Sequence, residues 1–214
     1  SRKEIRISGL ARRGRVRTAM GDAKNKELEK NIGRAAHYLQ RGGVVAAATE
    51  TFFGFLADIG RPRAVSHIRK IKGLEETAPL LIIVPTAAEV PRYCETWPPQ
   101  AAALAEAYWP GPLTLIVRAR MTFPKYLLGP YDTIALRVPG ESDAADILRL
   151  FARPLTATSC NRHGEPPTVT SRQTLETFEK KIDFIVPGSC PGGLPSTIVD
   201  ATGSPPVEIG TAHD

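Results

Sequence analysis

The stretch from Pro154 to Thr170 reads Pro-Leu-Thr-Ala-Thr-Ser-Cys-Asn-Arg-His-Gly-Glu-Pro-Pro-Thr-Val-Thr. Its first part, residues 155–158, is short, apolar and β-branched, which predicts a buried strand. Polar side chains suited to ligand binding follow at once, namely Ser159, Asn161, Arg162 and His163. Because open α/β sheets bind ligands at the carboxyl ends of their strands, this loop is a candidate binding site. A polar loop that merely follows a core strand is the alternative, and this stretch alone supports both about equally.

The bulk composition fits one globular domain. The chain has 214 residues, of which 42% are hydrophobic and 23% charged, enough for a single sizeable core. Its longest apolar run, residues 80–84, has the length of a strand and not of a membrane-spanning helix, so no membrane partner is expected. Three cysteines without the spacing of a metal site or redox pair favour a reducing cytoplasm. The four histidines show no metal pattern either, and we expect no protein-bound metal site.

The net charge of +6 is unevenly distributed along the chain. Seven basic residues stand in the first 20 positions against a single acidic one, Glu4, and the remainder of the chain is neutral overall. We therefore expect a basic N-terminal arm over residues 1–22 and an α/β domain over residues 23–210. Such an arm either binds the phosphates of an RNA partner or is a solvated tail, and we favour the tail.

Apolar residues at helical spacing alternate along the chain with short β-branched runs, which is the pattern of an α/β fold. We expect helices over residues 24–40, 62–72, 99–108, 144–151 and 171–181. Strands are expected over residues 44–48, 80–84, 113–117, 133–138, 155–158, 184–186, 198–200 and 207–209. Ser142 and Ser171 precede two of these helices and are predicted to cap them.

Arg137 stands out because it interrupts an otherwise apolar strand. A buried guanidinium needs a carboxylate, a phosphate or a route to solvent, since burying it unpaired is too costly. We favour an anion or nucleotide contact, with a structural ion pair as the alternative. For Thr49 and Thr51 the alternative to ligand binding is a capping turn. For Thr114 it is a rigid entry into a buried strand.

Five short blocks occur in a recognisable order. They read Thr49-Glu50-Thr51-Phe52-Phe53-Gly54, Trp109-Pro110-Gly111-Pro112-Leu113-Thr114, Arg137-Val138-Pro139, Ser159-Cys160-Asn161 and Ser196-Thr197-Ile198-Val199-Asp200. In this order the chain resembles the YrdC/YciO family over roughly residues 25–209. The resemblance implies a single α/β domain, in which a twisted mixed sheet with flanking helices surrounds a large concave cavity.

The resemblance also implies a function, L-threonylcarbamoyladenylate synthesis from ATP, L-threonine and bicarbonate. This product feeds a tRNA modification, so tRNA or double-stranded RNA is a further expected partner. ATP would be a substrate, accompanied by Mg²⁺. The residues carried over as nucleotide or phosphate ligands are Lys72, Arg137, Ser159 and Asn161. Those carried over as amino-acid ligands are Thr49, Thr51, Thr114 and Ser196.

Several positions depart from the family pattern. Leu74 stands where the family has an arginine, and Glu75 and Glu76 follow it. Near the end, Glu208 occupies the place of another arginine, and Phe53 replaces a tyrosine. Carboxylates near a triphosphate oppose its binding, and an ATP affinity no better than that for AMP is then expected. The alternative function is accordingly a nucleotide- or double-stranded-RNA-binding protein without synthase activity. Carbamoyl transfer to another acceptor is a third, weaker option.

Overall fold

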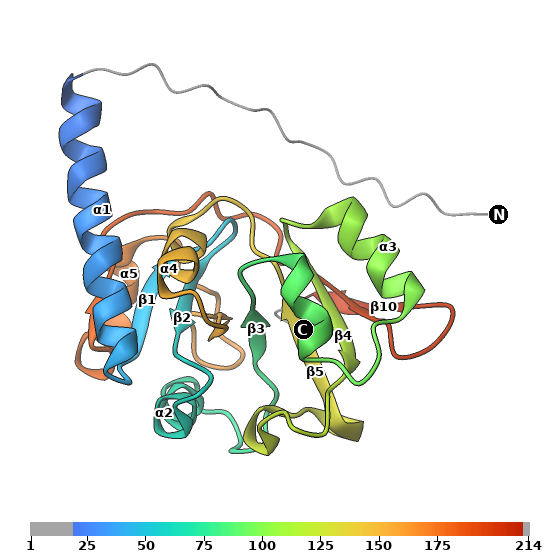
Figure 1. The fold of residues 1–214 in the computed structure, drawn as a ribbon. Helices are drawn as coiled ribbons and strands as arrows, with labels where there is room; N and C mark the ends of the chain where they lie inside the picture. Colours follow the sequence, from blue (N-terminus) through green and yellow to red (C-terminus); the bar gives the residue numbers. More distant parts are fainter. Residues whose placement is uncertain (1–18, 212–214) are drawn as a thin grey trace.

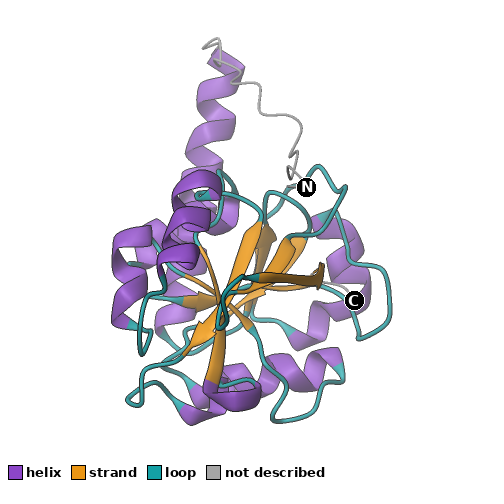
Figure 2. Ribbon diagram, turned by 90° about the vertical axis from the view of Figure 1, so that its right-hand side faces the viewer, coloured by secondary structure: helices purple, strands orange, loops and turns teal. Residues whose placement is uncertain are grey.

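The computed structural model describes residues 19–211. Its strands form two mixed sheets (Figures 1 and 2). The four-stranded sheet has the order β7-β2-β1-β8, and the six-stranded sheet has the order β10-β9-β4-β5-β3-β6. The predicted α/β class with mixed sheets and flanking helices is confirmed. Where we expected one twisted sheet, however, the structure has two.

The expected helices and strands occur in the expected order along the chain, but strand β2 was not predicted from the sequence. The helices are α1 (Ala19–Gln40), α2 (Pro62–Lys72), α3 (Pro99–Tyr108), α4 (Asp143–Phe151) and α5 (Ser171–Phe178), with 3-10 turns η1 (Ala87–Arg92), η2 (Lys125–Leu127), η3 (Pro130–Asp132) and η4 (Glu179–Lys181). The strands are β1 (Val45–Ala48), β2 (Phe53–Leu56), β3 (Leu81–Ile83), β4 (Leu113–Arg118), β5 (Thr133–Arg137), β6 (Leu155–Thr156), β7 (Thr158–Ser159), β8 (Phe184–Ile185), β9 (Thr197–Asp200) and β10 (Val207–Thr211).

Helix α1 begins at Ala19, so it includes the last residues of the predicted basic arm. Residues 1–18, which carry the arm's basic side chains, lie outside the described residues. The first turns of α1 extend beyond the rest of the fold (Figures 1 and 2), and its later turns pack on α4. Among residues 19–211, no helix is both long and apolar enough to cross a membrane.

Strand β1 is buried on both faces. Each face contributes to one of the two apolar clusters that make up the core. Val45 and Ala47 belong to the apolar cluster under α1 and α4. Ala46 and Ala48 belong to the larger cluster between the sheets and α2. Successive side chains of a strand point to opposite faces, and this explains why a run of four small apolar residues fits here.

The predicted strand over residues 155–158 is two strands in two different sheets. Strand β6 pairs with β3 in the six-stranded sheet, and β7 pairs with β2 in the four-stranded sheet. Ala157 lies between them, and its N–H donates to the carbonyl oxygen of Leu81 (3.0 Å). The chain therefore crosses from one sheet to the other immediately before Ser159.

Two helix caps were predicted, and one of them is wrong. The Ser142 hydroxyl accepts from the N–H of Ala145 (3.2 Å) at the start of α4, as expected. Helix α5 is capped by Thr170 and not by Ser171, because the Thr170 hydroxyl accepts from Gln173 N (3.2 Å). The Gln173 amide oxygen accepts from Thr170 N in return, which completes a capping box.

Candidate functional site

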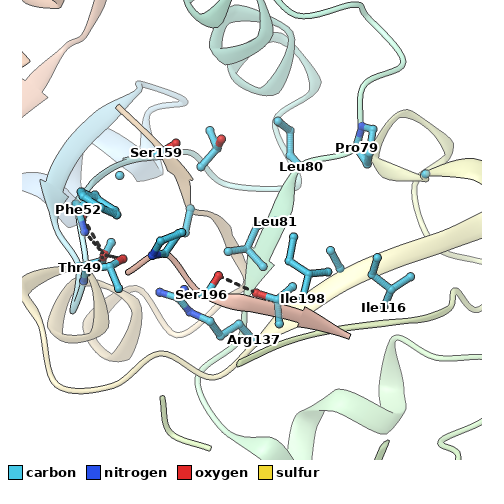
Figure 3. A pocket seen from close by; sticks show the side chains of 18 of the residues that line it. Thr49, Phe52, Pro79, Leu80, Leu81, Ile116, Arg137, Ser159, Ser196 and Ile198 are labelled. Carbon is cyan, nitrogen blue, oxygen red and sulfur yellow. Dashed lines mark hydrogen bonds between the residues drawn. The ribbon is translucent and has the colours of Figure 1, made fainter. Parts of the chain in front are cut away.

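A cavity of about 250 Å³ lies where the two sheets meet, and residues of both sheets line it. Of the predicted site residues, those that line it are Thr49, Thr51, Thr114, Arg137, Ser159 and Ser196. Figure 3 shows the labelled polar residues Thr49, Arg137, Ser159 and Ser196 towards one end of the cavity. The sequence blocks therefore do converge on one place, while their individual roles remain predictions.

The turn after β1 uses one threonine internally and turns another towards the cavity. The Thr49 hydroxyl accepts from the N–H groups of Thr51 (3.1 Å) and Phe52 (3.2 Å), and it donates to the Phe52 carbonyl (2.8 Å). This is the capping turn considered above. Thr51 Oγ1 lies 3.2 Å from Thr49 Oγ1 in the cavity lining. Thr49 thus shapes the turn, and Thr51 is better placed to meet a ligand.

A second pair of hydroxyls joins the neighbouring strands β4 and β9. Thr114 Oγ1 and Ser196 Oγ are 3.2 Å apart, and both residues are buried. Only one hydroxyl of such a pair can donate to the other, so the second hydrogen is left for another acceptor. The parallel pairing of β4 with β9 holds the two side chains in register. The cavity therefore has a fixed, buried hydrogen-bond donor at this wall.

Arg137 is both ion-paired and part of the cavity wall. Its Nη2 lies 3.0 Å from Glu50 Oε2, and the two side chains are only 4% and 15% exposed. Glu50 is held in turn by the N–H of Gly140, which donates to Oε1 (3.2 Å). Burial lowers the pKa of Arg137, and Glu50 acts in the opposite direction. Within the described part of the chain Arg137 Nε has no hydrogen-bond partner, which suits an anionic ligand oxygen.

Lys72 and Asn161 do not line the cavity in the described structure, and Lys72 reaches from α2 to the loop that carries Ser159 and Asn161. The Lys72 ammonium donates to the carbonyl oxygens of Ser159 (2.6 Å) and Asn161 (3.1 Å) and to Asn161 Oδ1 (2.9 Å). Asn161 Oδ1 also accepts from the Ser159 hydroxyl (2.6 Å). Burial lowers the pKa of Lys72 from 10.5 to about 8, partly offset by Cys160. Both side chains thus hold the loop in this structure, and their contact with the nucleotide remains a prediction.

Four of the departures from the family pattern, Leu74, Glu75, Glu76 and Glu208, lie away from this cavity, whereas Phe53, which replaces a tyrosine, lines it. The residues that line it include none of Leu74, Glu75 and Glu76 in the described structure. Leu74 packs against the core, and Glu76 accepts from the Ser66 hydroxyl (3.0 Å and 3.2 Å to its two oxygens). Glu208 is exposed on β10. These carboxylates are therefore not part of the cavity wall.

The other end of the cavity is apolar and was not foreseen from the sequence. Figure 3 shows its labelled residues Pro79, Leu80, Leu81, Ile116 and Ile198. Apolar residues of buried strands are indistinguishable by pattern from ordinary core residues, so no sequence signal marks them. Glu50 was also missed, although its place between two threonines of one block could have indicated it. No group of three or more potential metal ligands occurs among residues 19–211.

Two mixed sheets enclosing a cavity with polar and apolar ends define an α/β domain suited to binding a small molecule. The chain belongs to the Sua5_yciO_yrdC family, whose model, described as "Telomere recombination", matches residues 37–209.

The relatives have one name in common. The chain is 34% identical to threonylcarbamoyl-AMP synthase of Pyrococcus abyssi over 89% of this chain and 56% of the relative. It is 35% identical to the Nitrosococcus oceani protein of that name over 72% of this chain and 83% of the relative. The crystal structure of P. abyssi Sua5 complexed with L-threonine superposes with a TM-score of 0.78 at 34% identity, covering 83% of this chain and 53% of that one. The chain thus spans about half the length of the P. abyssi protein.

Proposed function

We propose that this protein makes threonylcarbamoyl-AMP from ATP, L-threonine and bicarbonate, for use in tRNA modification. The observation that carries the proposal is the cavity, where hydroxyl groups and one buried arginine meet an apolar wall. Relatives named threonylcarbamoyl-AMP synthase, at 34% and 35% identity, support it. So does the similarity to a structure that binds L-threonine.

In the proposed reaction, the amino nitrogen of L-threonine first bonds to the carbon of bicarbonate, and a C–O bond breaks with loss of water to give a carbamate. A carbamate oxygen then attacks the α-phosphorus of ATP, and the bond to the leaving pyrophosphate breaks. Such a transfer needs mainly positioning and stabilisation of negative charge. Thr51, Thr114 and Ser196 would orient the amino acid, while Arg137 would bind an anionic oxygen through its unpartnered Nε.

Ser159 is the residue of this loop that we propose to contact the nucleotide directly. Lys72 and Asn161 hold Ser159 in place. This assignment follows from the hydrogen bonds that hold the loop. We expect Mg²⁺ to accompany ATP, bound mainly by phosphate oxygens and water, as is usual for this ion. We place the reaction in the cytoplasm, and tRNA remains a proposed partner.

The alternative without synthase activity rested on Leu74, Glu75, Glu76 and Glu208. Because these residues lie outside the cavity wall, the electrostatic argument against ATP loses its force. The names of the relatives favour the synthase as well. We therefore retain the synthase as the proposal, and the expectation that ATP binds no better than AMP is kept as a test.

The decisive assay detects the product. The purified protein, ATP, Mg²⁺, L-threonine and bicarbonate are expected to yield threonylcarbamoyl-AMP and pyrophosphate, measured by liquid chromatography and mass spectrometry. Matched reactions without bicarbonate, or with L-valine in place of L-threonine, are expected to yield none. Absence of the product in the complete reaction, with the protein shown to be folded, would reject the proposed function.

A further inference from the structure

Arg69 on α2 is a fully buried cation to which the proposed reaction gives no role. Its side chain is among the largest that are fully buried, and the residue is 2% exposed. Nε donates to the carbonyl oxygen of Ala78 (2.9 Å), and Nη2 donates to that of Tyr126 (2.6 Å). Burial lowers the pKa of Arg69, and Glu76 acts in the opposite direction. A guanidinium that exchanges its hydration for neutral carbonyl groups needs an explanation, because an apolar residue would avoid this cost.

The two carbonyl groups belong to segments that form one wall of the cavity. Ala78 immediately precedes Pro79, the first of three consecutive lining residues. Tyr126 lies in η2, shortly before the lining residues Gly129 and Pro130. The segments touch, since a Cβ atom at Gly129 would lie 3.3 Å from the Cβ of Pro79. Arg69 therefore ties both segments to α2 from behind the wall.

This wall is at the apolar end of the cavity (Figure 3), where Pro79 and Leu80 lie. L-Threonine, bicarbonate and the triphosphate are mainly polar or charged and suit the hydroxyl-rich end. The adenine base is the one large, flat and weakly polar part of the proposed substrates. Apolar surface favours such a group because both lose contact with water on binding.

We infer that Arg69 is a positioning residue for nucleotide binding: by binding the carbonyl oxygens of Ala78 and Tyr126, it fixes the apolar wall against which the adenine base of ATP lies. The inference rests on the proposed function for the identity of the ligand. Arginine suits this task better than lysine because its planar fork donates from several nitrogens in fixed directions. A lysine would keep the charge without the geometry.

The test measures the binding of adenosine, which has no phosphate and cannot react. A change in its affinity therefore reports on the base-binding wall and not on the reaction. Calorimetry compares the unmodified protein with Arg69→Met and Arg69→Lys. The matched control is Arg153→Met, which removes another arginine bonded to a buried group, since Arg153 pairs with Asp58 (3.0 Å). Arg153 does not line the described cavity.

The Kd for adenosine is expected to rise about tenfold in Arg69→Met, because displacing a binding wall has effects of this size. A smaller rise is expected in Arg69→Lys. In Arg153→Met the melting temperature falls while the Kd is unchanged. In the synthase assay, the KM for ATP rises in Arg69→Met and the KM for L-threonine does not. Loss of fold stability alone would not produce this selectivity.

Three results would overturn the inference: no adenosine binding by the unmodified protein, an unchanged Kd in folded Arg69→Met, or an equal rise in Arg153→Met. If Arg69→Met does not fold, Gly129→Ala tests the same wall, because its Cβ would press on Pro79 (3.3 Å) and on Thr133 Oγ1 (3.1 Å). Unchanged adenosine binding in Gly129→Ala would then be the contradicting result. Arg69-dependent adenosine binding without product formation would support the inference and reject the proposed synthase.

Discussion

At the scale of single residues, three buried cations with different partners lie at the cavity or beside the segments that line it. Arg69, Lys72 and Arg137 are 2%, 5% and 3% exposed. Arg137 is paired with the carboxylate of Glu50, whereas Lys72 and Arg69 are bonded to backbone carbonyl oxygens and, for Lys72, an amide. These arrangements predict different responses to mutation and to pH.

Arg137→Met is expected to destabilise the fold by about 3–5 kcal/mol, because it leaves the Glu50 carboxylate buried without its partner. The control is the double variant Glu50→Gln, Arg137→Met, which removes both charges and is expected to recover most of this loss. Urea denaturation measures both values. A single variant within about 0.5 kcal/mol of the unmodified protein would show that the pair is solvated, contrary to its observed burial.

Lys72 predicts a dependence of stability on pH. Its pKa falls from 10.5 to about 8 on folding, so between these values the unfolded chain holds a proton that the folded protein has released. Its contribution to the free energy of unfolding therefore rises with pH across that window, by at most about 1.4 kcal/mol per pH unit, and is constant below it.

The pH experiment compares the unmodified protein with Lys72→Met by urea denaturation from pH 7 to pH 10. The difference between their free energies of unfolding is expected to stay level up to about pH 8 and to move in favour of the unmodified protein above it. Groups common to both proteins cancel in this difference. Parallel curves over the whole range would contradict the lowered pKa of Lys72.

At the scale of secondary structure elements, the longer helices were predictable and the shortest strands were not. The bounds of α2 and α3 agree with the sequence prediction because each has a proline at its start, and α2 also has a clear apolar period. Strands β6 and β7 have two residues each, too few for any period to be visible. Their assignment to different sheets follows from tertiary pairing and not from local preference.

The cap of α5 gives a prediction at this scale. Thr170→Ala removes the hydroxyl that accepts from Gln173 N and is expected to cost about 1 kcal/mol of stability. Ser171→Ala is the matched control, because Ser171 is the first helical residue and only accepts from Gly188 N (3.2 Å) at an exposed position. Thermal denaturation of both variants shows which substitution lowers the stability more. An equal or larger loss in Ser171→Ala would contradict the assignment of the cap.

The site itself was predictable only in its polar half. Hydroxyl groups near strand ends, as at Thr51, Ser159 and Ser196, can be found from the sequence because open α/β sheets bind ligands at the ends of their strands. The sequence also drew attention to Lys72 and Asn161, but it could not tell a ligand contact from a support of the loop. That distinction depends on side-chain direction, which is set by packing. The sequence did not mark the apolar wall, because its residues follow the same pattern as ordinary core residues of buried strands.

At the scale of the whole molecule, the charge asymmetry leads to a prediction about RNA. Residues 1–18 carry all the excess positive charge, and the rest of the chain has equal numbers of acidic and basic residues. Deleting residues 1–18 is expected to abolish any salt-dependent binding of RNA, because binding to phosphates releases counterions in proportion to the cations involved. The synthase rate is expected to be unchanged.

The measurement for this prediction is RNA binding at several salt concentrations, with the full chain and the shortened one, using fluorescence anisotropy. The control is product formation by both proteins. Equal RNA affinity and equal salt dependence would assign RNA binding to the folded domain. A loss of synthase activity on deletion would contradict the expectation that residues 1–18 take no part in synthesis.

The most direct test of the central claim is a crystal structure with L-threonine and a non-hydrolysable ATP analogue. L-Threonine is expected at the hydroxyl-rich end of the cavity near Thr51 and Ser196, and the adenine base against the wall of Pro79 and Leu80. An anionic oxygen is expected on Arg137 Nε, which has no hydrogen-bond partner in the described structure. Both ligands bound elsewhere, or a cavity left empty at saturating concentrations, would contradict the account.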